Sequence, residues 1–462
     1  MNDFEKERPE FRHKRLMWHA YRDLYAGGHQ FKNHAADYLL RRQKEPLDIY
    51  SERLQRVFYQ NYVGSILDWY AATLFRREPS LQMEGGLASG RAFLAEFADD
   101  ADLRGTTLAN FLKGCFIDAL VAGSSHILID FPRQAEDAHT RAEEDLTGLS
   151  RAFLVRYQAE ELINWSRNER GDYDWVVLRY VVRRQSDLYG DVSAEETYWR
   201  YYDRTEYRIY RKVVHEGRYN APIELIASGT HGLARQQRVP LIDLTMGEGL
   251  WLMDKAAQIQ LEHFNKANAL SWAITMGLFA MPVIYSDREW NQIVGESYFI
   301  QLGPKDRFGW TEPDGKVYQI AAENLEALKQ EIYRVCYLPQ ASGELISGHA
   351  QSAESKLLDF TITEEVLRAF GSLVKGCARR ILEAIVAARE DGVQVSVAGL
   401  DELNITDFTT ELQQAASLLQ MKIQSPTLQK EIYQRLAMKY LSDARQEVKD
   451  QIAREIESSP AQ

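Results

Sequence analysis

The 462-residue chain lacks the short motifs by which common nucleotide-dependent and metal-dependent enzymes are recognised. It has no GxxxxGKS/T and no GxGxxG loop, so nothing in it predicts an ATPase or a dinucleotide-binding enzyme. HExxH and paired Cys/His spacings are also absent, and Gly123-Ser124-Ser125-His126 lacks the second glycine of the serine-hydrolase GxSxG. We therefore expect no enzyme, and neither a bound metal nor another cofactor.

Cysteine is scarce, with only Cys115, Cys336 and Cys377 in the whole chain and no CxxC pair among them. Two of the three lie on apolar helical stripes, where a free cysteine packs as a small apolar residue. An odd number of cysteines without a paired spacing favours a reducing, intracellular setting.

Membrane-directed segments are also lacking. Residues 1–15 are charged throughout, a pattern that predicts no signal peptide. Residues 267–285 carry no charge and approach the length of a spanning helix, but Asn268, Gly277 and Pro282 interrupt them. We favour a helix buried on most sides by neighbouring subunits, because such a helix gives the same signal.

Basic residues are outnumbered, with 55 Lys and Arg against 67 Asp and Glu and a net charge of −12. This balance argues against tight, sequence-independent binding of nucleic acid, which needs clustered cations to release counterions.

Residues 352–389 show one apolar stripe at helical spacing and predict a helix about 57 Å long that crosses between modules. Gly371 and Gly376 lie inside it and predict a bend. Its apolar stripe is expected to be buried and consists of Leu358, Ile362, Val366, Phe370, Val374 or Leu373, Cys377, Ile381 and Ile385.

Further helices are predicted at residues 11–25, 50–74, 108–122, 250–277, 321–336 and 405–456. Gly27-Gly28 and Gly123 end the first and the third of these helices. His29 and His34, beside the first glycine turn, are interpreted as solvated loop histidines.

A period of two replaces the helical period in residues 153–241, which predict an antiparallel sheet of about five strands beginning with residues 153–157. Residues 126–131 predict another strand, in which Asp130 is interpreted as a capping or ion-pairing residue. Residues 393–397 add one more strand. The fold class is therefore α+β, with a small mixed segment between the helices that end at 277 and begin at 321.

These segments resemble, in order and spacing, the portal proteins of tailed bacteriophages. The resemblance spans residues 18–407, and residues 126–132 and 157–165 are similar to the family's wing-sheet segments. The family's channel loop often carries extra glycines and a Thr-rich helix start, where this chain has His349-Ala350-Gln351-Ser352. The N-terminal signature is carried by Trp18, Tyr25-Ala26-Gly27-Gly28, Tyr38-Leu39, Glu45-Pro46, Tyr50, Arg53-Leu54 and Leu74-Phe75-Arg76-Arg77-Glu78-Pro79.

The resemblance implies a portal-type multidomain subunit with a mainly antiparallel wing sheet, long stem and wing helices, a small α/β clip and a helical crown. The implied modules are a wing at 1–245, stem helices at 246–277 and 322–337, a clip at 278–321, a channel loop at 338–350, a long wing helix and strand at 351–400, and a crown at 401–462.

The implied function is a head–tail connector, a ring usually of twelve subunits at one capsid vertex of the virion, assembled in the host bacterial cytoplasm. Double-stranded DNA would pass through it without sequence specificity during packaging and ejection. The implied partners are the terminase large subunit, the head–tail adaptor, and the major capsid and scaffolding proteins, with no membrane. Two alternatives stay open: an intracellular enzyme with an unrecognised site on the sheet of residues 153–241, and a membrane-anchored assembly factor.

Three groups of residues are the expected sites of a portal subunit. The DNA channel is expected to be lined by Lys329, Arg334, Ser347, His349, Gln351 and Lys356. The clip and adaptor interface is expected at Trp290, Phe299, Phe308 and Trp310. Packing between stems of neighbouring subunits is expected at Met253, Leu261, Phe264 and Trp272.

Overall fold

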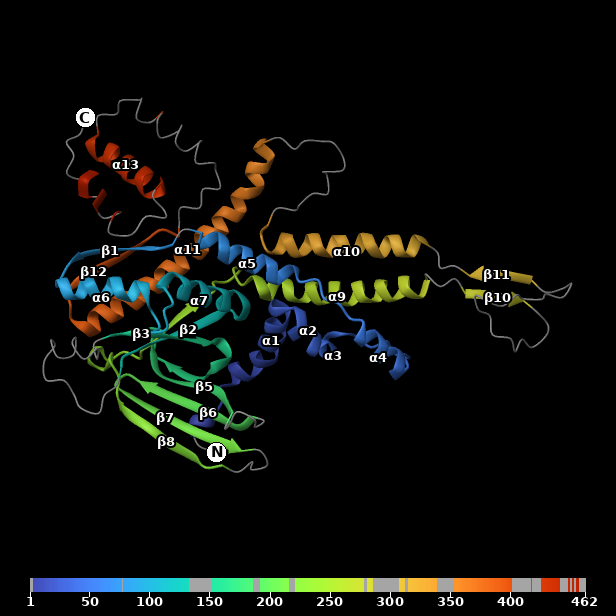
Figure 1. The fold of residues 1–462 in the computed structure, drawn as a ribbon, viewed down its shortest axis with the longest axis horizontal. Coiled ribbons are helices and arrows are strands. Elements are labelled where there is room, and N and C mark those ends of the chain that lie inside the picture. The colour runs from blue at the N-terminus through green and yellow to red at the C-terminus, as the bar shows by residue number, and fades with distance from the viewer. Residues whose placement is uncertain are drawn as a thin grey trace. The chain divides into compact units, whose positions relative to one another are not determined.

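The structure, a computed structural model, shows a mixed α+β chain with antiparallel sheets and several long helices (Figure 1). It divides into two compact units, of which the first contains Met1–Trp18, Asp68–Trp251 and Gln351–Gln462 and the second contains His19–Leu67 and Leu252–Ala350. The described residues are 3–76, 78–132, 151–185, 192–215, 221–277, 281–285, 307–311, 315–338, 353–400, 417, 425–440, 448, 451–452 and 454–456.

A small three-stranded sheet forms the centre of the first unit. Its middle strand, β2 (Ser124–Asp130), pairs antiparallel with β3 (Phe153–Gln158) on one side and with β9 (Leu241–Thr245) on the other. The buried helix α7 (Leu108–Ala122) leads into β2, and its last turn ends at Gly123, whose φ of 85° suits a left-handed helix end. Helix 108–122 was predicted with these bounds.

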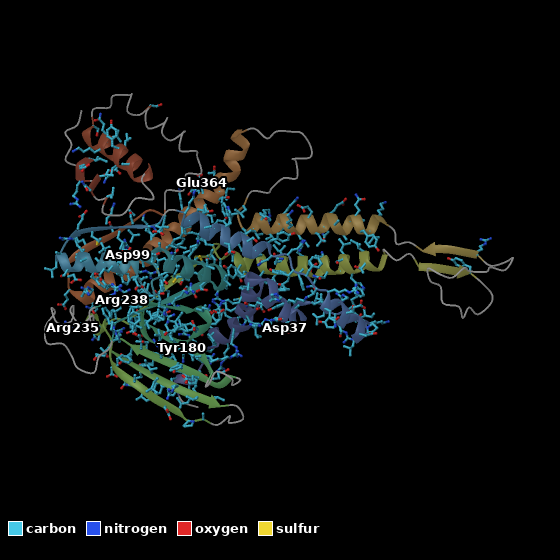
Figure 2. All side chains as sticks on the ribbon, viewed as in Figure 1. Asp37, Asp99, Tyr180, Arg235, Arg238 and Glu364 are labelled. Carbon is cyan, nitrogen blue, oxygen red and sulfur yellow. The ribbon has the colours of Figure 1, made fainter. Side chains whose placement is uncertain are left out.

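A second, larger sheet has the order β4-β5-β6-β7-β8 and carries Tyr180, which is labelled in Figure 2. Tyr180 stacks on Tyr198 at a centroid distance of 5.1 Å. All of its neighbouring strands are antiparallel. Its strands are β4 (Leu162–Arg167), β5 (Tyr173–Gln185), β6 (Val192–Asp203), β7 (Glu206–His215) and β8 (Ile223–Thr230).

The prediction that residues 153–157 belong to this sheet is wrong, because they form β3 of the smaller one. The short 3-10 helix η2 (Ala159–Glu161) separates β3 from β4, and a capping box between Gln158 and Glu161 stabilises the break. The backbone N–H of Gln158 donates to the Glu161 carboxylate at 2.6 Å. One continuous period-two run therefore supplies strands to two different sheets.

The longest helix is α11 (Ala353–Arg389), one residue shorter at its start than predicted. Phe370 is fully buried, with ring centroids 5.5 Å from Tyr70 and 5.2 Å from Phe116. After α11, β12 (Val393–Ala398) pairs antiparallel with β1 (Ser80–Gly85), a strand that the sequence pattern did not indicate. The remaining elements of this unit include η1 (Asp3–Glu5), α6 (Ala88–Asp99), η3 (Ala234–Gln236) and α13 (Pro426–Tyr440).

The predicted stripe of α11 is buried from Val366 onward but fails at Ile362, which is 60% exposed. Thr363 is fully buried in its place. Because a helix has 3.6 residues per turn, side chains spaced by repeated steps of four move gradually around the helix axis. Thr363 is seven residues before Phe370, and its side chain differs in direction from that of Phe370 by only about 20°. The side chain of Leu358 lies outside the described residues.

The two glycines of α11, from which a bend is predicted, have different surroundings. A Cβ at Gly371 would lie 2.0 Å from the backbone oxygen of Leu400, whereas a Cβ at Gly376 would meet no atom within 4 Å. Gly371 therefore lets the backbone after β12 approach the helix closely.

The second unit contains two long antiparallel helices, α9 (Leu252–Gly277) and α10 (Gly315–Val335), which lie side by side (Figure 1). α10 begins six residues earlier than predicted. Between the two helices in the chain, β10 (Met281–Tyr285) and β11 (Arg307–Thr311) form a two-stranded antiparallel pair. No helix within the described ranges is long and apolar enough to cross a membrane.

Residues 50–74, predicted as one helix, form α4 (Leu47–Gln55) and α5 (Tyr62–Leu74), with an irregular segment between them. α1 (Pro9–Ala26) enters this unit at His19 and is followed by the short helices α2 (Gly28–Asn33) and α3 (Ala35–Tyr38). Phe31, Tyr59 and Phe264 pack their rings together, with Phe31 stacked on Tyr59 at 4.0 Å.

Candidate functional site

The antiparallel pair of α9 and α10, here called the stem hairpin, has a defined register. The Tyr318 hydroxyl donates to the backbone oxygen of Ala273 at 3.2 Å, and the Lys266 ammonium donates to the side chain of Asn324 at 2.9 Å. Covered or half-covered residues of α10 recur at helical spacing, consistent with one face lying against α9. They are Tyr318, Ala321, Leu325, Leu328 and Ile332.

Three amide side chains of α9 bind the backbone of the N-terminal segment of the same unit. Asn268 accepts from Phe58 N at 3.1 Å and donates to Phe58 O at 2.9 Å. Gln260 and Asn265 each bond one backbone N–H and one backbone C=O in the same way. Gln260 and Asn268 satisfy backbone groups between residues 58 and 63, and Asn265 satisfies those of Tyr38 and Leu40. These parts of the segment therefore do not need to be helical for their backbone groups to be hydrogen-bonded.

A second apolar set on the stem hairpin has no cover. Val317 is 64% exposed and Ile320 is 60% exposed on α10, while Ile274 is 42% exposed on α9. All three lie within about one turn of the Tyr318–Ala273 contact, at the end of the hairpin that leads to β10 and β11. We call Ile274, Val317 and Ile320 the hairpin edge.

The predicted stem-packing residues divide into two kinds. Met253 is fully buried and Phe264 is 1% exposed within a single chain, so neither offers surface to a neighbour. Leu261 and Trp272 are half-buried, and the Arg56 guanidinium lies 5.8 Å from the Trp272 ring. Leu261 and Trp272 are therefore the accessible members of the predicted set.

The predicted channel residues fall only partly within the described residues. Lys329 pairs with Glu326 at 3.2 Å, and Arg334 pairs with Glu331 at 2.7 Å, each with a glutamate three residues earlier on α10. The hydrogen bond from Arg334 lowers the pKa of Glu331. Lys356 lies in α11, but its side chain is outside the description. Ser347, His349 and Gln351 also lie outside the described residues.

The predicted clip residues are described only where they belong to β11. In the register of that pair, Phe308 is opposite Ile284 and Trp310 is opposite Pro282. Trp290 and Phe299 lie outside the described residues.

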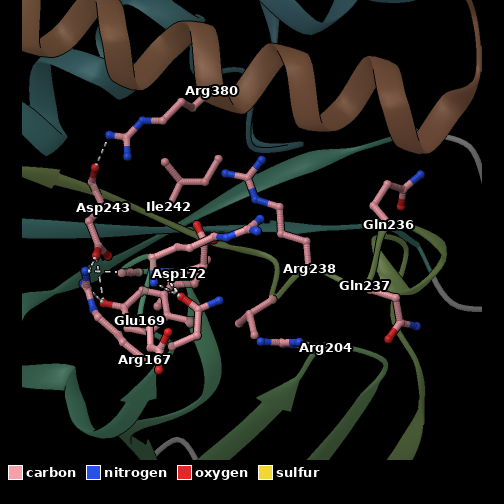
Figure 3. A pocket seen from close by; sticks show the side chains of 16 residues that line it. Arg167, Glu169, Asp172, Arg204, Gln236, Gln237, Arg238, Ile242, Asp243 and Arg380 are labelled. Carbon is pink, nitrogen blue, oxygen red and sulfur yellow. Dashed lines mark hydrogen bonds and ion pairs between the residues drawn. The ribbon is translucent and has the colours of Figure 1, made fainter.

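The first unit holds a pocket of about 780 Å³ that the sequence did not reveal (Figure 3). Five arginines line it, from the β4–β5 turn, the β6–β7 turn, the segment before β9, and α11. They are Arg167, Arg170, Arg204, Arg238 and Arg380. Sequence periodicity could not find them, because they are far apart in the chain.

One carboxylate, Asp243 on β9, organises one side of the pocket. It lies 2.7 Å from His126 Nδ1, accepts from the Tyr173 hydroxyl at 2.8 Å and accepts from Arg167 at 2.6 Å. Burial by itself would raise the pKa of Asp243, but these neighbours outweigh it and hold the pKa below its ordinary value. Arg380 reaches the backbone oxygen of Asp243 at 2.7 Å.

This arrangement does not form a nucleophile and base. Ser125 and His126 are consecutive on β2, so their side chains point to opposite faces of the sheet. The guanidinium groups of Arg170 and Arg238 have no partner among the described residues. Guanidinium groups without a carboxylate partner can attract an anionic group.

The histidines beside the glycine turn differ from their prediction. His29 is exposed, but His34 lies 2.9 Å from the buried carboxylate of Asp23 and is not a solvated loop residue. Asp130 accepts a hydrogen bond from Phe131 N at 3.0 Å, in agreement with its interpretation as a capping residue.

No protein-family model matches the sequence, and neither does any of the curated proteins. Among solved structures, the chain is similar to one from the neck of an empty gene transfer agent particle computed with C6 symmetry, at 12% identity over 80% of this chain and 90% of that one, with a TM-score of 0.45. It is also similar to a chain of the virion of a native gene transfer agent particle, at 13% identity over 86% and 96%, with a TM-score of 0.43. A chain from the native neck computed with C12 symmetry gives 12% identity over 76% and 82%, with a TM-score of 0.41.

Proposed function

We propose that this chain is a structural subunit of a phage-like particle, a portal-type protein that assembles into a ring and gives DNA a passage. The observation that carries the proposal is the hairpin edge: Ile274, Val317 and Ile320 are branched apolar residues exposed on a pair of packed helices. Apolar side chains gathered in this way mark a contact surface. A neighbouring copy of the same hairpin would cover them.

The dimensions of the stem hairpin suit this role. α9 has 26 residues and α10 has 21, so they extend about 39 Å and 32 Å at 1.5 Å per residue. Contacts between one edge of a hairpin and another edge of the next copy are head-to-tail, and head-to-tail contacts close into rings when the rotation allows. The resemblance of the sequence to phage portal proteins supports the same geometry.

The channel would carry few unpaired cations. Lys329 and Arg334 are each matched by a glutamate on the same helix, and the chain as a whole carries −12. DNA would then be repelled over most of the lumen and attracted only locally, which favours sliding over sticking. The proposed partners remain the terminase large subunit, the head–tail adaptor, and the capsid and scaffolding proteins.

Mass measurement by size-exclusion chromatography with light scattering tests the ring. The chain mass is 53.2 kDa, and we expect a particle of about twelve times that mass. A monomer at every protein concentration would contradict the proposal.

The hairpin edge is tested by Val317→Glu combined with Ile320→Glu. Burying two carboxylates between copies is unfavourable, so the ring should dissociate while the circular dichroism spectrum stays unchanged. The matched control is Leu225→Glu, an exposed apolar residue of β8 in the other unit, at 54% exposure. The proposal fails if the double variant keeps the ring, or if the control breaks it equally.

The DNA passage is tested by Lys329→Glu combined with Arg334→Glu in a packaging assay. Both side chains are partly exposed, so the rings should form normally while packaging slows. Loss of the rings would assign these residues to subunit contact instead.

A further inference from the structure

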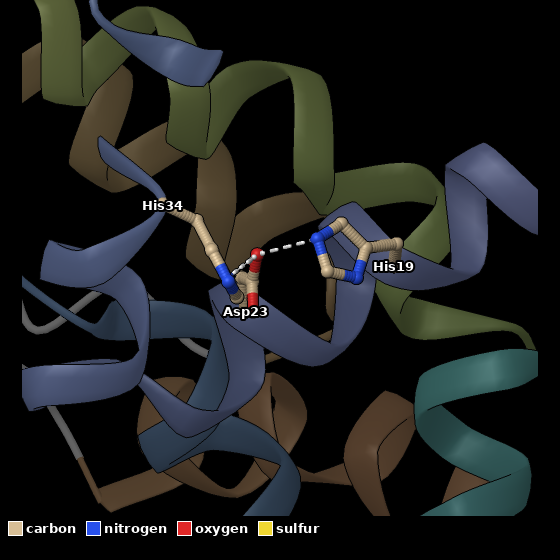
Figure 4. A group of neighbouring side chains, drawn as sticks. All are labelled: His19, Asp23 and His34. Carbon is tan, nitrogen blue, oxygen red and sulfur yellow. Dashed lines mark hydrogen bonds and ion pairs between the residues drawn. The ribbon is translucent and has the colours of Figure 1, made fainter. Parts of the chain in front are cut away.

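Three potential metal ligands of the second unit come together beside the glycine turn (Figure 4). His19 and Asp23 are four residues apart on α1 and therefore lie on the same face of that helix. His34 approaches from the junction of α2 and α3. One nitrogen of each histidine and one oxygen of Asp23 all lie within 4.8 Å of one another.

The closest approaches within this trio are short enough for a shared ion. His34 Nδ1 lies 2.9 Å from Asp23 Oδ2, and His19 Nε2 lies 3.5 Å from the same oxygen. Ligand atoms around a tetrahedral Zn²⁺ at about 2.0 Å are themselves about 3.3 Å apart. The observed separations bracket that value.

Asp23 is held in place by neighbours that are not part of the trio. It is fully buried, accepts from the Tyr38 hydroxyl at 2.6 Å on Oδ2, and accepts from Gln30 Nε2 at 3.0 Å on Oδ1. Such outer hydrogen bonds orient the ligands in protein metal sites and limit the rearrangement that binding requires.

The turn that returns the chain to α1 is built for a close approach. Gly27 has a φ of 59°, and a Cβ there would lie 2.8 Å from the Asn61 side chain. A glycine at this position lets α2 begin immediately after α1 and places His34 opposite the face that carries His19 and Asp23. The histidine side chains are 56% and 40% exposed, so an ion can reach them from solvent.

We propose that His19, Asp23 and His34 form a site for a divalent transition metal, with Zn²⁺ as the expected ion. Two imidazoles and one carboxylate are a ligand set that suits Zn²⁺ and leaves a fourth position for water. The ion joins α1 to the α2–α3 junction. This site is independent of ring formation, because all three ligands belong to one chain and one unit.

Binding requires only small changes. A carboxylate can only accept, so His34 donates its Nδ1 proton to Asp23 in the metal-free protein. Coordination uses the other neutral tautomer, with the proton on Nε2 and the Nδ1 lone pair on the metal. His19, the most exposed of the three, rotates toward the ion.

The experiment uses the full chain after treatment with a chelator and dialysis. Co²⁺ is added as a spectroscopic probe, and Zn²⁺ is added in calorimetry and in thermal unfolding. We expect visible Co²⁺ bands of a four-coordinate site, one Zn²⁺ per chain, and a rise in Tm with Zn²⁺. His19→Ala and His34→Ala should each weaken Zn²⁺ binding at least tenfold and remove the Co²⁺ bands.

The matched control is His29→Ala, an exposed histidine of the neighbouring helix α2, which should bind Zn²⁺ as the unmodified chain does. Tyr38→Phe keeps all three ligands but removes the hydroxyl that orients Asp23, and should weaken binding by about tenfold. Circular dichroism confirms that each variant is folded. Equal affinity in the unmodified chain and in the His19→Ala, His34→Ala double variant would overturn the proposal, as would loss of binding in His29→Ala.

Discussion

α11 and α10 are both long helices that carry apolar residues, but they differ in how many of these residues stay exposed. From Val366 to Ile385, the apolar stripe of α11 is covered by its own unit, with Phe370 and Ile381 fully buried. α10 covers one stripe against α9 and leaves Val317 and Ile320 more than half exposed. Val317 and Ile320 lie together with Ile274 on the hairpin edge, which our proposal assigns to contact with a second copy, whereas single exposed apolar residues are normal on a protein surface.

Under the proposed function, this difference separates residues that stabilise the single chain from residues that join one copy to the next. Substitutions in α11 should lower the free energy of unfolding of a single chain. Substitutions at the hairpin edge should leave that free energy nearly unchanged and alter the mass of the particle. The predictions that follow test this separation.

The largest expected effect is that of Phe370→Ala. The side chain is fully buried between Tyr70 and Phe116, so its truncation removes transfer free energy and leaves a cavity. We expect a loss of about 3–5 kcal/mol in the free energy of unfolding, measured by denaturant titration. Ile362→Ala, on the exposed face of α11, should change it by less than about 0.5 kcal/mol. Equal losses would mean that the burial of α11 is misassigned.

The second effect distinguishes the two glycines of α11. Gly371→Ala would place a Cβ against the backbone oxygen of Leu400, and overpacking of this kind costs about 1–3 kcal/mol. Gly376→Ala meets open space inside a helix and should stabilise the chain by about 0.5–1 kcal/mol. Opposite signs of the two changes in Tm support the close approach at Gly371, and an unchanged or higher Tm in Gly371→Ala would contradict it.

Local periodicity predicted the helices, because their backbone hydrogen bonds join residues that are close in sequence. The predicted bounds of the helices at 108–122 and 352–389 agree with the structure to within one residue. Their apolar stripes lie within the segments themselves. The sheet that a strand joins depends instead on distant partners. Residues 153–157 pair with β2 although their period matches that of β5, and the capping box at Gln158 was the only local sign of a break.

The third effect lies in the second unit. Asn268→Ala removes both hydrogen bonds to Phe58 and leaves the backbone N–H and C=O of that residue without their partner. We expect a loss of about 1–2 kcal/mol in the free energy of unfolding. Ser271→Ala, on the exposed side of the same helix, is the control and should be nearly neutral. If both variants behave alike, the amides of α9 do not hold the N-terminal segment.

The candidate sites were harder to predict than the fold, because their members come from different elements. His19 and Asp23 show a helical spacing of four in the sequence, but His34 joins them only through the turn at Gly27. The five arginines of the pocket are spread from residue 167 to residue 380. By contrast, Lys329 and Arg334 were predicted as DNA-facing cations of one helix, and their pairing with Glu326 and Glu331 follows from a helical spacing of three.

The smallest expected effect completes the comparison with α11. In the Val317→Glu background, where we expect dissociated subunits, Ile320→Ala should change the free energy of unfolding by less than about 0.5 kcal/mol, because the side chain is already 60% exposed. In the otherwise unmodified chain, the same substitution should weaken the ring and shift the light-scattering mass toward the monomer at low protein concentration. A loss above 1 kcal/mol in the dissociated subunit would show that Ile320 stabilises its own chain, and the distinction between α10 and α11 would then fail at this residue.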